Sequence, residues 1–163
     1  IRDVAVTGVQ TCALPIYGVN VPAASGNFSK LEIWNPVNSG KALVVFACQV
    51  WQTSGTVTYK TSLSSSPMSA NESSATKQNS FAGSSITSSV KIYTKNDDAT
   101  SASSVISQLP VTSTTPNGTN ILPLIQGVAM PNNGVRFEST TANMAINAVL
   151  VWAEVDLSDL PAV

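Results

Sequence analysis

Apolar and polar residues alternate along much of this chain with the period of two that β-strands require, and no stretch has the period of a helix. Turn-forming residues such as Asn, Pro and Gly separate the alternating segments, notably around residues 35–40 and 131–134. We therefore expect an all-β chain. The predicted strands cover residues 31–34, 42–52, 56–61, 90–95, 121–129, 135–140 and 144–157, with a brief strand or turn near 105–109.

The short turns suggest how these strands pair. Residues 53–55 are predicted to join segments 42–52 and 56–61 in a hairpin, and the last three segments are predicted to form a meander. Residues 62–89 are rich in Ser, Ala and Asn, which indicates a long exposed excursion. The architecture that fits best is an antiparallel β-sandwich of jelly-roll type with long Ser/Thr-rich loops.

Segments 42–52 and 144–157 are apolar on both faces, whereas a sandwich buries only one face of each strand. The second face needs a cover, either from the Ser-rich loops or from another subunit. We expect a homo-oligomer, with a homotrimer as the simplest symmetric arrangement. The predicted interface residues are Val45, Ala47, Trp51, Val149, Val151 and Val155.

Net charge and composition argue against several classes of function. The chain has a net charge of −1, only 10% charged residues and no His. A nearly neutral chain lacks the surplus of Lys and Arg that nucleic acids and anionic membranes attract, so we expect neither partner. Without His, the commonest general base and metal ligand are missing. We therefore expect no catalysis, no cofactor and no metal.

Residues 6–16 match the translation of a sequencing-adapter oligonucleotide, so residues 1–16 are predicted to be a non-native leader and residues 17–163 a single β-sandwich domain. Cys12 falls in the leader, which leaves Cys48 as the one cysteine of the domain and excludes an intrachain disulfide. Cys48 lies in an apolar strand without a nearby cation, as expected for a buried, inert thiol.

Two groups of acidic residues are candidates for reactive or metal-binding sites. Glu154 and Asp156 share a strand face at a spacing that a glycosidase pair could use, but a charged strand end explains them better. Asp97 and Asp98 offer oxygen ligands for Ca²⁺, yet a solvated turn is the simpler interpretation. Arg136 and Glu138 alternate outward from Val135 and Phe137, as expected for a surface cross-strand ion pair.

Three aromatic residues, Trp34, Tyr59 and Tyr93, support an alternative function. Trp34 has the parity opposite to Leu31 and Ile33, so its ring is predicted to point away from the core. Exposed aromatic rings can stack on sugars, and the alternative prediction is therefore a carbohydrate-binding or adhesive β-sandwich module.

Two segments of the chain resemble segments of a known group of proteins. Residues 31–45 contain an Asn-Pro turn followed by Ser-Gly-Lys and a strand that is apolar on both faces, and residues 131–154 end in a Trp-x-Glu strand. Together they resemble the small β-sandwich virion proteins of tailed bacteriophages, which are head-decoration, head-fibre or tail-associated proteins. The resemblance implies a virion structural protein, located in the extracellular particle, that binds itself and other virion proteins.

Overall fold

The computed structural model describes residues 15–51, 56–68, 71–72, 78–79, 88–100, 105–112, 120–121 and 127–159. This part of the chain is all-β, with a single three-residue helix, η1 (Leu157–Asp159), after the last strand. The strands are β1 (Pro15–Val21), β2 (Phe28–Asn35), β3 (Lys41–Trp51), β4 (Thr56–Ser64), β5 (Asn71–Glu72), β6 (Gln78–Asn79), β7 (Lys91–Asp97), β8 (Val105–Thr112), β9 (Asn120–Ile121), β10 (Gly127–Ala129), β11 (Asn133–Ser139) and β12 (Ile146–Asp156).

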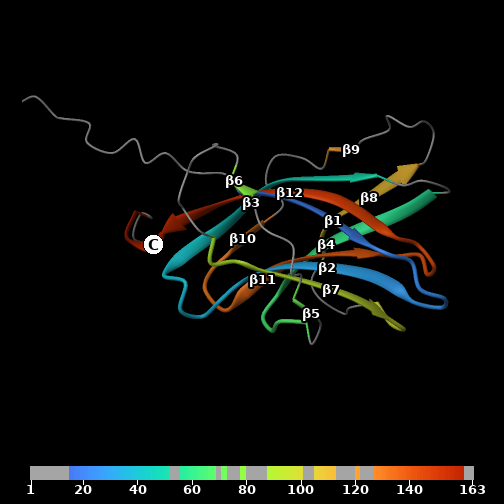
Figure 1. The fold of residues 1–163 in the computed structure, drawn as a ribbon, viewed down its shortest axis with the longest axis horizontal. Helices are drawn as coiled ribbons and strands as arrows, with labels where there is room; N and C mark the ends of the chain where they lie inside the picture. The colour runs from blue at the N-terminus through green and yellow to red at the C-terminus, as the bar shows by residue number, and fades with distance from the viewer. Residues whose placement is uncertain are drawn as a thin grey trace, which may run out of the picture.

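The strands form two antiparallel sheets that lie one above the other (Figure 1). Sheet A has the order β10-β3-β12-β1-β6, and the short β9 also pairs with β3. Sheet B has the order β5-β7-β2-β11-β4-β8. The sequence therefore predicted the fold class correctly, and the expected strands at residues 31–34, 42–52, 56–61, 90–95, 135–140 and 144–157 are all present with shifted ends.

The predicted pairings of neighbouring strands are wrong. The expected hairpin does not form, because β3 belongs to sheet A and β4 to sheet B. The expected meander does not form either: β10 and β12 pair with β3, whereas β11 pairs with β2 and β4. A short turn requires only that the chain reverses, and here each reversal crosses from one sheet to the other. This crossing lets both strands turn an apolar face toward the same core.

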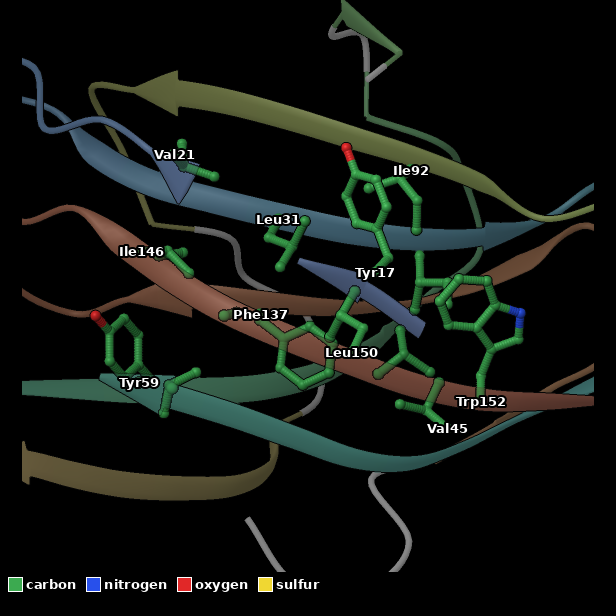
Figure 2. Packing of buried hydrophobic residues seen from close by; sticks show 14 of the residues in the cluster. Tyr17, Val21, Leu31, Val45, Tyr59, Ile92, Phe137, Ile146, Leu150 and Trp152 are labelled. Carbon is green, nitrogen blue, oxygen red and sulfur yellow. The ribbon is translucent and has the colours of Figure 1, made fainter. Parts of the chain in front are cut away.

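The core lies between the sheets and takes large side chains from both (Figure 2). Leu31 and Phe137 come from sheet B, and Leu150 and Trp152 come from sheet A; each is at most 1% exposed. On β12 the alternation is regular, with Ile146, Ala148, Leu150 and Trp152 facing inward. The opposite residues of β12 must therefore point away from the core.

The leader and the Ser-rich excursion contribute to the described sheets. Pro15 and Ile16, the last residues of the predicted leader, begin β1, where Ile16 lies opposite Val151; the rest of the leader lies outside the described residues. The excursion supplies β5, which pairs with β7, and β6, which pairs with β1. It is not wholly exposed, since Met68 is 8% exposed.

Candidate functional site

The outer face of sheet A carries aliphatic side chains that do not belong to the core. Val149 and Val151 alternate with the buried residues of β12 and lie opposite Gly18 and Ile16 of β1. Directly opposed residues of an antiparallel pair point to the same side of the sheet. By the same rule Val44 lies beside Val128. We call this surface the valine face: Ile16, Val44, Val128, Val149, Val151 and Val155.

The valine face is partly accessible, and its members carry no charge, while Ala42 and Ala153 on the same side of the sheet are at most 2% exposed. Ile16 is 37% exposed and Val128 is 48% exposed, while the other four members are partly buried. At one end of the face the Asn20 Nδ2 donates a hydrogen bond of 2.6 Å to the Asn147 Oδ1. At the other end Asp156 follows Val155 and lies opposite Lys41, but its position on β12 alternates with that of Val155, so this pair is not part of the face. An apolar surface with a polar margin is typical of a protein contact.

The structure corrects one predicted interface residue, Val45. Its side chain is fully buried in the core, because β3 contains a β-bulge. Val45 lies opposite Trp152, and Ala47 lies opposite Val151, so Phe46 is the extra residue between them. After a bulge, the residues that faced inward by simple alternation face outward, and the reverse. The prediction for Val45 assumed an unbroken alternation along the strand.

Of the other predicted interface residues, Val149, Val151 and Val155 lie on the valine face. Ala47 and Trp51 occupy β3 positions opposite Val151 and Asn147, and their side chains lie outside the described residues. The Cys48 side chain, at the β3 position opposite Leu150, also lies outside the described residues, so its burial stays a prediction.

The outer face of sheet B has the opposite character, because it concentrates charge. Five of the eight basic residues and three acidic residues lie on strands β2, β4, β7 and β11 with side chains on this face. They are Lys30, Glu32, Lys60, Lys91, Lys95, Asp97, Arg136 and Glu138. This face is therefore a poor match for an apolar partner.

One row of the ladder crosses three strands. Glu138 of β11 lies between Lys30 of β2 and Lys60 of β4, with Nζ to carboxylate oxygen distances of 3.7 and 3.5 Å. The Glu138 side chain is fully buried, and those of Lys30 and Lys60 are 6% and 9% exposed. Burial of a carboxylate requires compensation by charge, which the two ammonium groups supply.

The next row contains a tighter interaction. The Arg136 Nη2 donates to the Glu32 Oε1 at 2.8 Å, and the Arg136 Nε donates to the same oxygen at 3.2 Å. The Ser64 hydroxyl also donates to this oxygen, at 2.5 Å, and the backbone N–H of Met68 donates to the Glu32 Oε2 at 2.7 Å. Glu32 is fully buried.

This carboxylate fastens the chain beyond β4 onto sheet B. Residues 65–68 leave β4, and the Arg136 Nη2 reaches the Ser66 carbonyl at 3.3 Å. The chain then reaches β5 on the far side of β2 and β7. The surface ion pair expected for Arg136 is therefore a buried one, and Glu32 is the partner that sequence reasoning missed.

Two further carboxylates have structural partners. Hydrogen bonds from Lys95 and Lys30 hold the pKa of Asp97 well below its ordinary value. Burial alone would raise the pKa of Glu154, but hydrogen bonds from Ser88, Ser89 and Trp152 outweigh burial, and its net pKa is lowered.

The candidate acidic residues Glu154 and Asp156 thus have different partners. Glu154 accepts hydrogen bonds from both the backbone N–H and the hydroxyl of Ser89, while Asp156 lies opposite Lys41. Among the described residues, no group of three or more His, Cys, Asp or Glu side chains is placed to hold a metal ion. The Glu154 carboxylate serves to attach the segment before β7 to the end of β12.

The predicted sugar-stacking platform is wrong. Trp34 is 4% exposed and Tyr59 is 2% exposed, so neither ring is available to a sugar. Trp34 does lie on the outer face of sheet B, but its ring fills the space above Gly134, which has no side chain. The Tyr59 hydroxyl donates to the Ala145 carbonyl at 2.8 Å. Only Tyr93 is partly exposed, and a single ring is no platform.

The part of the chain that the structure describes contains no helix with the length and apolar character needed to cross a membrane. The chain matches no protein-family model, no curated protein and no solved structure at a significant level.

Proposed function

We propose that this chain is a structural protein of a tailed-phage virion, a capsid decoration (cement) or fibre-associated protein that acts by binding sister subunits and other virion proteins. The observation that carries the proposal is the valine face. Apolar side chains on the outer side of a sheet are costly to leave in water, and their burial against a copy stabilises the assembled state.

The order of the strands supports a jelly roll, a fold common in capsid proteins. In that fold the first, eighth, third and sixth strands form one sheet, and the second, seventh, fourth and fifth form the other. When the short β5, β6 and β9 and the edge strand β7 are set aside, the remaining strands follow this order. They run β1-β12-β3-β10 and β2-β11-β4-β8.

The arrangement of charge also favours a structural role. The buried charges of sheet B pair with one another, and the carboxylates of Glu154 and Asp97 hold neighbouring segments. These groups fix the sandwich, and the valine face is left for contact. A homotrimer remains the simplest assembly that we propose.

The test is the oligomeric state of the full chain, measured by light scattering after size exclusion and by native mass spectrometry. We expect an oligomer, and Val149→Lys should dissociate it, because Gly18 leaves open space beside Val149 and a buried interface would hold an unpaired ammonium. Ala99→Lys is the matched control, since Ala99 is exposed just beyond β7, at the edge of sheet B opposite β8. A wild-type chain that stays monomeric at high concentration would contradict the proposal.

A further inference from the structure

The two sheets are joined at one end through the carboxylate of Glu154. Glu154 has the same parity on β12 as the buried Trp152, so its side chain lies on the inner side of sheet A near the end of the strand. The Glu154 Oε2 accepts hydrogen bonds from the Ser89 hydroxyl at 2.7 Å and from the Ser89 backbone N–H at 3.2 Å. Ser89 lies just before β7 of sheet B, with Val90 between them. Glu154 therefore ties the end of a sheet A strand to the start of a sheet B strand.

Residues 88–90, which Glu154 holds, include a member of the core. The Ser88 hydroxyl donates to Glu154 and accepts the backbone N–H of Val90 at 3.3 Å. Val90 is fully buried and belongs to the same apolar cluster as Trp152. Separation of residues 88–90 from Glu154 therefore uncovers apolar side chains at this end of the sandwich.

The described partners of the Glu154 carboxylate are neutral donors. Besides the two serines, the Trp152 indole Nε1 donates to the Glu154 Oε1 at 3.4 Å. The buried carboxylates of sheet B differ, because they pair with cations, as Glu32 does with Arg136. Protonation of Glu154 therefore weakens hydrogen bonds to the described partners and breaks no ion pair with them.

The charged groups of the neighbouring strands lie in other directions. Opposite Glu154 on β3 is the apolar Leu43. Asp156 and Lys41 lie opposite each other in the next row on the same side of sheet A. Lys91, the first residue of β7, has the parity of the outer face of sheet B. Of these groups, the pair of Asp156 and Lys41 shares the side of Glu154, and its two charges offset each other.

We propose that Glu154 is an acid-released latch, whose protonation frees residues 88–90 from β12 and opens this end of the sandwich. The inference goes beyond the proposed function, because it does not depend on the surface that binds a partner. Hydrogen bonds to a charged acceptor are about twice as strong as those to a neutral one. Protonation removes this strength and also sets a hydroxyl donor against groups that are themselves donors. The hydrogen bonds that weaken are those that attach Ser89.

Linkage gives the direction of the pH dependence. Burial raises the pKa of Glu154, but hydrogen bonds from Ser88, Ser89 and Trp152 outweigh burial and hold the pKa below the ordinary value of 4.5. The latched state therefore binds the proton more weakly than the open state. The contribution of the latch is complete above pH 4.5 and is lost as the pH falls through the lowered pKa.

Glu154→Gln in the full chain tests the latch at neutral pH, because it keeps the shape of the side chain, removes the charge and sets an NH₂ group against the donors. We expect amide exchange at Val90, followed by NMR, to be roughly tenfold faster or more than in the wild-type chain. Binding of a hydrophobic dye should increase, while the far-UV circular dichroism spectrum stays unchanged. Asp156→Asn is the matched control, since it neutralises a carboxylate of the same strand that lies opposite Lys41, and it should leave this exchange unchanged.

A pH titration of the wild-type chain is the second measurement. The Val90 amide and Trp152 indole N–H signals should shift together with a midpoint below pH 4.5, and Glu154→Gln should abolish this midpoint. Exchange at Val90 that is the same in Glu154→Gln and the wild type overturns the inference, as does equal acceleration by Asp156→Asn. Loss of the whole circular dichroism signal at the pH at which the Val90 amide opens also overturns it, because acid then unfolds the sandwich and not one end.

Discussion

The buried carboxylate of Glu32 gives the strongest prediction about stability. Glu32→Gln keeps the shape of the side chain but removes the charge that pairs with Arg136, whose side chain is only 12% exposed. One of the two carboxylate oxygens also becomes an NH₂ group. That group faces hydrogen-bond donors, namely Arg136 and Ser64 or the N–H of Met68. A donor cannot replace the lost acceptor.

The cost follows from the burial of the pair. Removing one partner of a buried ion pair destabilises a protein by about 3–5 kcal/mol. For a domain of this size each kcal/mol lowers the melting temperature by about 2–4 °C, so the variant should melt roughly 6–20 °C below the wild type. The measurement is the free energy of unfolding in urea, followed by tryptophan fluorescence, together with calorimetry.

A double-mutant cycle separates the ion pair from general damage. Arg136→Met alone leaves Glu32 buried and unpaired, while Glu32→Gln combined with Arg136→Met removes both charges. We expect the double variant to be more stable than the sum of the two single losses predicts, by at least about 1 kcal/mol. Additive losses, or a loss below about 1 kcal/mol for Glu32→Gln, would refute the reasoning.

Three other predictions concern single positions. Gly134→Ala should cost about 1–3 kcal/mol in urea unfolding, because its Cβ would lie 2.8 Å from a tryptophan ring, whereas Gly18→Ala, with no atom within 4 Å, should be nearly neutral. The folded pKa of Asp97 lies below its ordinary value of 3.8, so its contribution is present above that pH and lost as the pH falls toward the lowered value. Asp97→Asn should flatten the acid limb of a stability-against-pH curve; an unchanged limb would contradict the ion pairs. Tyr59→Phe should cost about 1 kcal/mol in thermal melts, because the part-buried hydrogen bond from the Tyr59 hydroxyl to the Ala145 carbonyl is lost, and an unaltered melt would contradict a stabilising role for this bond.

The local pattern of the sequence located most strands but not their partners. Alternation and turn residues depend on neighbours in the chain, which is why β3 and β12 were found almost to their ends. Whether a reversal stays in one sheet or crosses to the other depends on which apolar faces meet. That information is not local, so the hairpin of β3 with β4 and the closing meander were predicted wrongly.

The residues of the candidate surface were likewise predictable only where local alternation decides which way a side chain points. Val149, Val151 and Val155 were placed on an outer apolar face because β12 alternates without interruption. Val45 was misplaced because the bulge at Phe46 is defined only by pairing with β12.

The sequence by itself determined the all-β class, the positions of most strands and the scarcity of charge, since these follow from residue type and spacing. Only the tertiary structure decided where the few charges meet. Glu32 and Arg136 are 104 residues apart and become partners because β2 and β11 are adjacent in sheet B. It also decided that Trp34 is buried, because Gly134 on the neighbouring strand leaves room for its ring. Burial and pairing are properties of strands that meet in space, and no local pattern encodes them.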